Sequence, residues 1–233
     1  MGAQWKKAGK MEASNKKGAV ITKIVRELQV AARMGGPDPD GNPRLRRALD
    51  AARLAACSRD TVERAIKKGS GQLEGDAIEE CTYEGFAPHQ VGVIVECQTD
   101  NRTRTAGEMR VLFKSHGGQM GESGSVSWMF DRVGLVEAVA PDGMKDAEEE
   151  AIEAGANDVE QGEGSTYYFY GAIEDIETIK TGLSSRKWKI TSAEPSYKAK
   201  NKTELTPEQR KEVEEFLGEL DEFEDSSRVY VTL

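Results

Sequence analysis

Apolar residues in the first seventy positions follow helical spacing. From Val20 onward they recur at steps of three and four, which is the spacing of one buried helix face. A Gly-Gly-Pro run at 35–37 ends this pattern, because glycine supports a left-handed cap and proline cannot continue a helix. Two shorter helical patterns follow, opened by the capping residues Asn42 and Ser58 and closed near Gly69. We therefore expect a small three-helix bundle.

Beyond Gly75 the pattern becomes a mixture of strands and helices. Expected strands are 79–83, 91–97, 125–130, 134–139, a short segment near Val159, 166–170, 188–192 and 227–232. Expected helices are 101–115, 145–154, 173–183 and 206–220. From 134 to 192 the order is β-α-β-β-α-β, the ferredoxin-like split pattern, and 193–203 has the composition of a polar linker. The final helix–strand pair is too small to fold alone, so we expect it to join the sheet of 76–132.

These elements predict an α+β protein with three domains. Residues 1–75 would form a basic arm and an N-terminal three-helix bundle. Residues 76–132 plus 204–233 would form a discontinuous middle α/β domain, and 133–203 a ferredoxin-like α/β domain. The length of 233 residues is enough for each to bury a core of its own.

Charge is distributed unevenly along the chain. The formal net charge is −9, but residues 1–75 carry +8 and the remainder carries −17. Such asymmetry favours a basic segment that contacts a polyanion, beside acidic segments that do not. The alternative is that solvated helices simply carry many charges.

The basic segment supplies most of the candidate nucleic-acid-binding residues. Flexible lysines suit phosphate neutralisation, and arginine forks suit bidentate phosphate or base contacts. These candidates are Trp5, Lys6, Lys7, Lys10, Lys16, Lys17, Lys23, Arg26, Arg33, Arg44, Arg46, Arg47, Arg53, Arg64, Lys67 and Lys68. Trp5 would stack on an unpaired base or, alternatively, pack on the protein body.

A second candidate site lies at 100–105, where a strand runs into a helix. Arg102 and Arg104 are its candidate phosphate ligands, because they lie at the start of that helix. The alternative for this segment is ordinary helix capping by Asn101.

Signals for catalysis, metals or cofactors are weak. His89 and His116 have no metal-ligand spacing, and the three cysteines include no CxxC pair. A glycine-rich run at 117–124 lacks the GxxxxGK[ST] pattern, so turn geometry is favoured over phosphate binding. We expect no enzyme activity, no catalytic residue, no metal or other cofactor, and no small-molecule substrate. The odd number of cysteines, the Lys-rich start and the absence of a long apolar run predict a cytoplasmic protein that does not enter a membrane.

Several sequence segments resemble the YebC family. They are MGAQWK at 1–6, GGPDP at 35–39 with Asn42, RLR at 44–46, ERAIKKG at 63–69, YEGFAP at 83–88, VIVEC at 93–97, TDNR at 99–102, GSV at 124–126 and VYV at 229–231. The resemblance spans nearly the whole chain. The opening is shorter than the Gly-His-Ser-Lys-Trp start of the main branch and is similar to that of a related branch.

The resemblance implies three domains, with the C-terminal segment rejoining the middle one. It also implies a non-enzymatic cytoplasmic regulator of gene expression. Family members are similar to DNA-binding transcriptional regulators or to factors that assist ribosomes at proline-rich stretches. The leading hypothesis is therefore a transcriptional regulator that binds DNA through the basic N-terminal segment. The alternative is a ribosome-associated translation factor that binds ribosomal RNA.

Overall fold

The computed structural model describes residues 15–144 and 146–233, without side chains for 15–17. Its described residues divide into two compact units. The first, here called the bundle–sheet unit, contains 15–126 and 203–231. The second, the ferredoxin-like unit, contains 127–202 and is grouped with the last two residues. The predicted α+β class is confirmed, whereas the division into three domains stays a prediction.

Three helices open the bundle–sheet unit: α1 (Asn15–Gly35), α2 (Pro43–Leu54) and α3 (Arg59–Gly69). Their apolar faces meet in a small core of Leu28, Ala31, Leu45, Ala48, Ala52 and Ala65. Small side chains dominate this core, so the helices approach closely. At Gly69 a Cβ atom would lie 2.2 Å from the carbonyl oxygen of Gln29 on α1, so only glycine fits there.

Asn42 joins α1 to α2. Its side-chain oxygen accepts the backbone N–H of Leu45 at 3.0 Å, which caps α2 as the sequence predicts. Its amide nitrogen donates to the carbonyl oxygens of Ala31 at 2.7 Å and Gly36 at 2.9 Å. Asn42 is itself buried, so one side chain satisfies the end of one helix and the start of the next.

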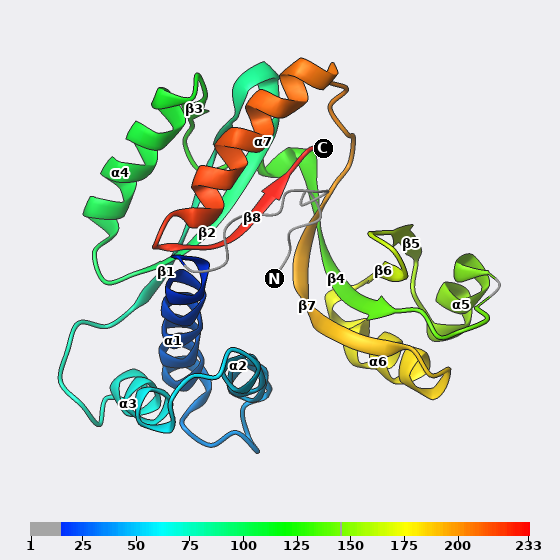
Figure 1. Cartoon of the computed structure of the whole chain (residues 1–233), viewed down its shortest axis with the longest axis horizontal. Coiled ribbons are helices and arrows are strands. Elements are labelled where there is room, and N and C mark those ends of the chain that lie inside the picture. Colours follow the sequence, from blue (N-terminus) through cyan, green and yellow to red (C-terminus); the bar gives the residue numbers. More distant parts are fainter. Residues whose placement is uncertain (1–14, 145) are drawn as a thin grey trace. The chain divides into compact units, whose positions relative to one another are not determined.

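A four-stranded sheet completes the bundle–sheet unit, in the order β3-β1-β2-β8 (Figure 1). Its elements are β1 (Glu79–Phe86), β2 (Gly92–Thr99), α4 (Arg102–Ser115), β3 (Gln119–Met120), α7 (Pro207–Glu222) and β8 (Ser226–Val231), with a short 3-10 turn η1 (Pro88–Gln90) between β1 and β2. All neighbouring strands are antiparallel, and the C-terminal β8 pairs with β2. Phe113 of α4 and Phe216 of α7 are fully buried and meet edge to face with centroids 5.0 Å apart, which fixes these two helices against each other.

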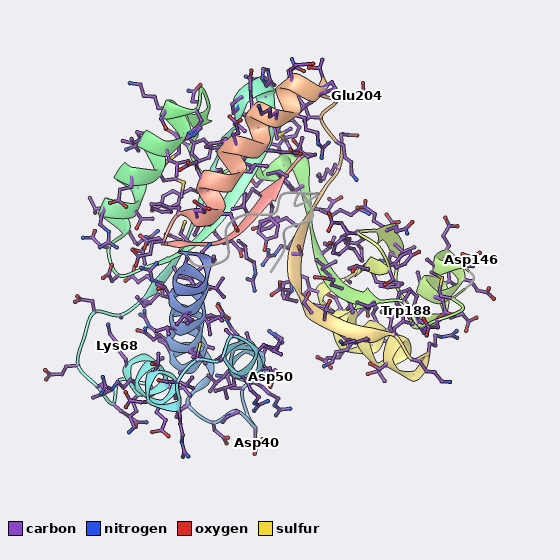
Figure 2. All side chains as sticks on the ribbon, in the orientation of Figure 1. Asp40, Asp50, Lys68, Asp146, Trp188 and Glu204 are labelled. Carbon is purple, nitrogen blue, oxygen red and sulfur yellow. The ribbon has the colours of Figure 1, made fainter. Side chains whose placement is uncertain are left out.

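The ferredoxin-like unit has its own antiparallel sheet, in the order β5-β6-β4-β7. Its elements are η2 (Ser127–Met129), β4 (Phe130–Val139), α5 (Ala147–Ala154), β5 (Asp158–Gln161), β6 (Thr166–Gly171), η3 (Ile173–Asp175), α6 (Ile176–Ser185) and β7 (Lys189–Ala199). This is the predicted β-α-β-β-α-β succession. Trp188, labelled in Figure 2, packs edge to face on Tyr167 and Phe169 in the core of this unit.

Two sequence predictions about strands are wrong. Residues 193–199 are not a linker but the second half of β7, which pairs with β4 from Phe130 onward. Polar residues in that half are buried, among them Glu194 and Ser196, which is why the segment is too polar to be predicted as a strand. The strand expected at 125–130 is absent up to Met129, where the chain forms a loop and the 3-10 turn η2.

Glu84 explains why residues 121–126 form a loop. Its buried carboxylate accepts the backbone N–H of Gly124 at 2.8 Å and of Val126 at 2.9 Å. Its backbone carbonyl also accepts the N–H of Gly121 at 2.8 Å. The N–H groups that a strand would use for pairing are therefore satisfied by one side chain on β1. The glycine-rich run is a clamped turn, as the sequence favoured.

Candidate nucleic-acid interface

Six of the predicted contact residues have no described side chain. They are Trp5, Lys6, Lys7 and Lys10, which lie outside the described residues, and Lys16 and Lys17, which belong to α1. The remaining candidates fall into two groups, those that bind other parts of the chain and those on the surface.

Two cations of α1 contact the C-terminal segment. The ammonium group of Lys23 donates to the carbonyl oxygen of Asp221 at 2.5 Å. The guanidinium of Arg26 donates to the carbonyl oxygen of Glu224 at 2.5 Å and pairs with the carboxylates of Glu224 at 2.8 Å and Asp225 at 2.7 Å. The Arg26 side chain is 12% exposed. These two residues share a helix face as the sequence suggests, but that face is directed into the fold.

Asp225 is the centre of this contact. Only 3% of its side chain is exposed, and its carboxylate also accepts the hydroxyl of Thr105 at 2.6 Å and lies 3.4 Å from Arg104. Burial alone would raise the pKa of Asp225, but the Thr105 hydroxyl and the Arg26 charge together hold that pKa below its usual value. A carboxylate that is ionised at neutral pH therefore ties α1 and α4 to the segment after α7.

Arg33 and Arg44 also bind within the unit. Arg33 donates to the carbonyl oxygen of Ile78 at 3.0 Å. Arg44 pairs with Glu27 of α1 at 2.7 Å and with Glu80 of β1 at 2.6 Å. Although burial opposes it, the hydrogen bonds that Arg44 donates to both carboxylates raise its pKa, so this side chain stays charged. Its carboxylate partners compete with any phosphate for the guanidinium.

A basic surface remains on α2 and α3, formed by exposed cations that are held only by neighbours on or beside their own helix. We define the α2–α3 basic surface as Arg46, Arg47, Arg53, Arg59, Arg64 and Lys67. The pairs Arg46–Asp40 at 3.8 Å, Arg53–Asp50 at 2.9 Å, Arg59–Glu63 at 2.8 Å and Arg64–Asp60 at 3.1 Å are all solvent-exposed. Figure 2 labels Asp40 and Asp50 beside α2. Exposed pairs of this kind are worth at most about 1 kcal/mol, so a phosphate can displace them.

Arg59 is an addition to the sequence-based candidates. It is the first residue of α3, after the capping residue Ser58, and its side chain is among the most exposed cations of the unit. The sequence places Arg59 in the first turn of a helix whose later turns carry Arg64, Lys67 and Lys68, so this candidate was visible there. Lys68, by contrast, is half-buried and lies beside Gly75.

The second candidate site divides between its two arginines. Asn101 caps α4, because its side-chain oxygen accepts the N–H of Arg104 at 3.0 Å. Arg104 pairs with Asp100 at 2.8 Å and points toward Asp225. Arg102 is 65% exposed and has a single long ion pair, 4.0 Å from Glu79. Of the two, Arg102 is the more exposed, because 43% of the Arg104 side chain is accessible.

Histidine and cysteine chemistry contributes little to this surface. His89 pairs with Glu212 of α7 at 2.7 Å, and His116 lies at the end of α4 against Phe216. Within the described ranges, no three histidine, cysteine or acidic side chains are grouped as metal ligands. Among the same residues, every helix is too short or too polar to span a lipid bilayer.

Two family models together cover almost the whole sequence. Residues 1–72 match the TACO1/YebC protein N-terminal domain, and residues 78–233 match the TACO1/YebC second and third domain. The chain belongs to the TACO1/YebC family. The resemblance inferred from the sequence segments is thereby confirmed.

Relatives within the family match over their full length. A probable transcriptional regulatory protein of Bdellovibrio bacteriovorus is 59% identical, with all of both chains covered. A probable transcriptional regulatory protein of Pseudomonas syringae pv. tomato is 48% identical over all of this chain and 99% of its own. The crystal structure of a conserved hypothetical protein from Aquifex aeolicus has a TM-score of 0.85 and 39% identity, and the match covers 97% of this chain and 93% of that one.

Proposed function

We propose that this chain is a non-enzymatic regulator of gene expression that acts in the cytoplasm and binds DNA through its α2–α3 basic surface. The observation that carries the proposal is the separation of the N-terminal cations into two sets. Arg26 and Arg44 are held by buried or half-buried carboxylates, whereas the α2–α3 basic surface has only exposed partners. Family relatives named as probable transcriptional regulatory proteins support the same function.

The surrounding charge restricts where a polyanion can bind. Residues beyond 75 carry a net charge of −17, so most of the chain repels phosphates. Binding through the basic surface would leave the acidic segments out of contact with phosphates. Nucleic-acid binding is therefore assigned to the α2–α3 basic surface, and its affinity is expected to depend strongly on salt concentration.

Ribosomal RNA is the second candidate partner. Helix α2 has no asparagine, glutamine, serine or threonine, so its arginines and Asp50 are the side chains of that helix that could read base edges. Its arginines suit phosphates, and phosphate contacts position a protein without selecting a sequence. A surface of this kind fits a structured RNA as well as a duplex DNA, and a translation factor would use it on the ribosome.

A charge-removal variant tests the proposal. Four alanine substitutions, Arg47→Ala, Arg53→Ala, Arg64→Ala and Lys67→Ala, remove four exposed cations from the basic surface. Binding of the full chain to a labelled DNA duplex and to a ribosomal RNA fragment is followed by fluorescence anisotropy across a salt series. If all four cations contact phosphates, the slope of log K against log salt becomes shallower by about 3.6 for the duplex and about 2.8 for single-stranded RNA.

A matched variant supplies the control for net charge. It carries Lys180→Ala, Lys200→Ala, Lys202→Ala and Lys211→Ala, which remove four cations at other exposed sites. The proposal requires that this variant binds like the wild type. Equal loss of binding in both variants, or a flat salt dependence in the wild type, contradicts it. Co-sedimentation with ribosomes that depends on the same four basic residues would favour the RNA candidate over DNA.

A further inference from the structure

Helix α4 is a basic element inside the acidic part of the chain. It carries Arg102, Arg104, Arg110 and Lys114 against a single acid, Glu108, a net charge of +3. The other helices of that part are neutral or acidic, and α7 carries seven acids against two cations. The positive charge of α4 therefore contrasts with the neutral or negative charge of the other helices beyond residue 75.

An open groove lies beside the first half of α4. It has a volume of about 580 Å³ and is lined by Tyr83, Arg102, Thr103, Ala106, Gly107 and Arg110. Tyr83 of β1 donates its hydroxyl to the carbonyl oxygen of Arg102 at 3.2 Å, which fixes the strand side of the groove to the helix. The side chains of Arg102 and Arg110 are exposed, and Glu79 lies 4.0 Å from Arg102.

Gly107 leaves the helix side of the groove without a side chain at its own position. A Cβ atom at this position would meet nothing within 4 Å, so packing inside the unit does not require glycine. Glycine in the middle of a helix lowers helix stability relative to alanine. Gly107 lies between Arg102 and Arg110 in sequence. Because it has no side chain, a ligand held by these two arginines can approach the helix backbone closely.

Three cations follow the length of α4 beside this groove. Arg110 and Lys114 are four residues apart and share a face with Thr103 and Gly107, whereas Arg102 lies about 80° around the helix from Arg110 and borders the same groove. At 1.5 Å per residue, Arg102 and Arg110 are about 12 Å apart along the axis, and Arg110 and Lys114 about 6 Å. A linear ligand with regularly spaced negative charges matches cations at these axial spacings.

We propose that this groove is a second binding site for the phosphodiester backbone of a nucleic-acid strand, with Arg102, Arg110 and Lys114 as its phosphate ligands. The inference rests on the proposed function and extends it, because it gives the chain two separate contacts with one polyanion. Charge complementarity favours this occupant: arginine binds phosphate through paired N–H donors, and the series of cations continues beyond the groove with Lys114. Gly107 lets the strand approach the helix backbone.

Charge reversal at Arg110 is the direct test. The full chain with Arg110→Glu is compared with wild type for binding to a labelled DNA duplex and to a labelled RNA hairpin, across a salt series. The control Lys211→Glu makes the same change in net charge on α7, at an exposed site away from the groove. Loss of one phosphate contact is expected to weaken binding about five- to eight-fold at 0.1 M salt and to reduce the salt slope by about 0.7–0.9. Repulsion from the new glutamate adds to that loss, while Lys211→Glu stays near wild type.

Two further variants separate binding from folding. Arg110→Lys keeps the charge and is expected to recover most of the affinity. Gly107→Ala is expected to raise the thermal midpoint of the protein, because alanine favours the helix, and yet to weaken binding, because the methyl group enters the strand's path. A purely structural role for Gly107 would not give these opposite signs.

The result that overturns the inference is binding by Arg110→Glu that matches Lys211→Glu while the four-alanine variant of the basic surface loses affinity. That result would support nucleic-acid binding by the α2–α3 basic surface and would refute a binding site in the α4 groove. A wild-type chain that binds neither probe refutes both. Binding of a polyglutamate peptide that depends on Arg110, without any such dependence for nucleic acid, would assign the groove to an acidic protein segment instead.

Discussion

Replacing Asp225 with alanine tests the contact between α1 and the C-terminal segment. Asp225 and its neighbour Glu224 both pair with Arg26, at 2.7 and 2.8 Å, but they differ in burial. Only 3% of the Asp225 side chain is exposed, against 71% for Glu224. Asp225 and Glu224 therefore form a matched pair: both bind Arg26, and they differ in how far their own side chains are exposed to solvent.

The expected cost follows from what each substitution leaves behind. Asp225→Ala leaves the largely buried Arg26 with the carboxylate and carbonyl oxygens of the exposed Glu224 and removes one acceptor of the Thr105 hydroxyl. Removal of one member of a buried ion pair costs about 3–5 kcal/mol, and the remaining Glu224 contact places the expected loss near 3 kcal/mol. Glu224→Ala removes an exposed partner and should cost less than about 1 kcal/mol.

The pH dependence of this difference has a defined sign. Because the pKa of Asp225 is lower in the folded protein than its usual value, the carboxylate stabilises the fold fully above that usual value. Its contribution is lost as the pH falls below about 4, toward the lowered pKa of the folded state. The stability difference between wild type and Asp225→Ala should therefore shrink with acid, and it should be constant between pH 6 and 8.

Urea denaturation followed by far-ultraviolet circular dichroism measures these free energies. Hydrogen exchange in peptides from β2 and α7 assigns the change to the bundle–sheet unit, while peptides around Trp188 report the ferredoxin-like unit as an internal reference. Equal losses from Asp225→Ala and Glu224→Ala would refute the argument from burial. An undiminished difference at pH 3 would refute the role of the charged carboxylate.

Three other substitutions have defined outcomes in the same denaturation assay. Asn42→Ala removes a helix cap and two buried donors and should cost about 2–4 kcal/mol, and Asn42→Asp should cost at least as much, because the cap remains but a buried carboxylate oxygen would face two carbonyl oxygens. Gly69→Ala should cost about 1–3 kcal/mol, because its methyl group would lie 2.2 Å from a carbonyl oxygen, whereas the open Gly218 should accept alanine without loss. Glu84→Ala leaves two backbone N–H groups without their acceptor and should cost about 2–4 kcal/mol, with faster hydrogen exchange confined to 121–126.

Local sequence rules predicted the helix starts well. The capping residues Asn42, Ser58, Asn101 and Thr206 each accept the N–H three residues later, and Thr206 forms a full capping box with Gln209. These interactions lie within four residues, so a short window of sequence contains all of their chemistry. The β-α-β-β-α-β succession was visible for the same reason.

Long-range partners were not visible in the sequence. Whether Arg26 faces solvent depends on residues 224 and 225, almost two hundred positions away. The strand at 193–199 depends on pairing with β4, and the loop at 121–126 depends on Glu84. In each case a tertiary partner decides the structure of a segment whose own composition favours another outcome. Arg102 at the start of α4 was a candidate from the sequence, but Arg110, Lys114 and the groove beside them were missed, because the overall charge beyond residue 75 masks one basic helix.

The contact between α1 and the C-terminal segment has a consequence for synthesis of the chain. Lys23 and Arg26 are made 198 residues before their partners Asp221 and Glu224. Chains fold from the N-terminus as they emerge, at about 5–20 residues per second. Throughout that interval these two cations are thus available to other anions, and the ribosome presents the nearest RNA. Synthesis of 221–225 withdraws them, so a chain stalled before that segment would keep a more adhesive N-terminal segment than a chain that contains it.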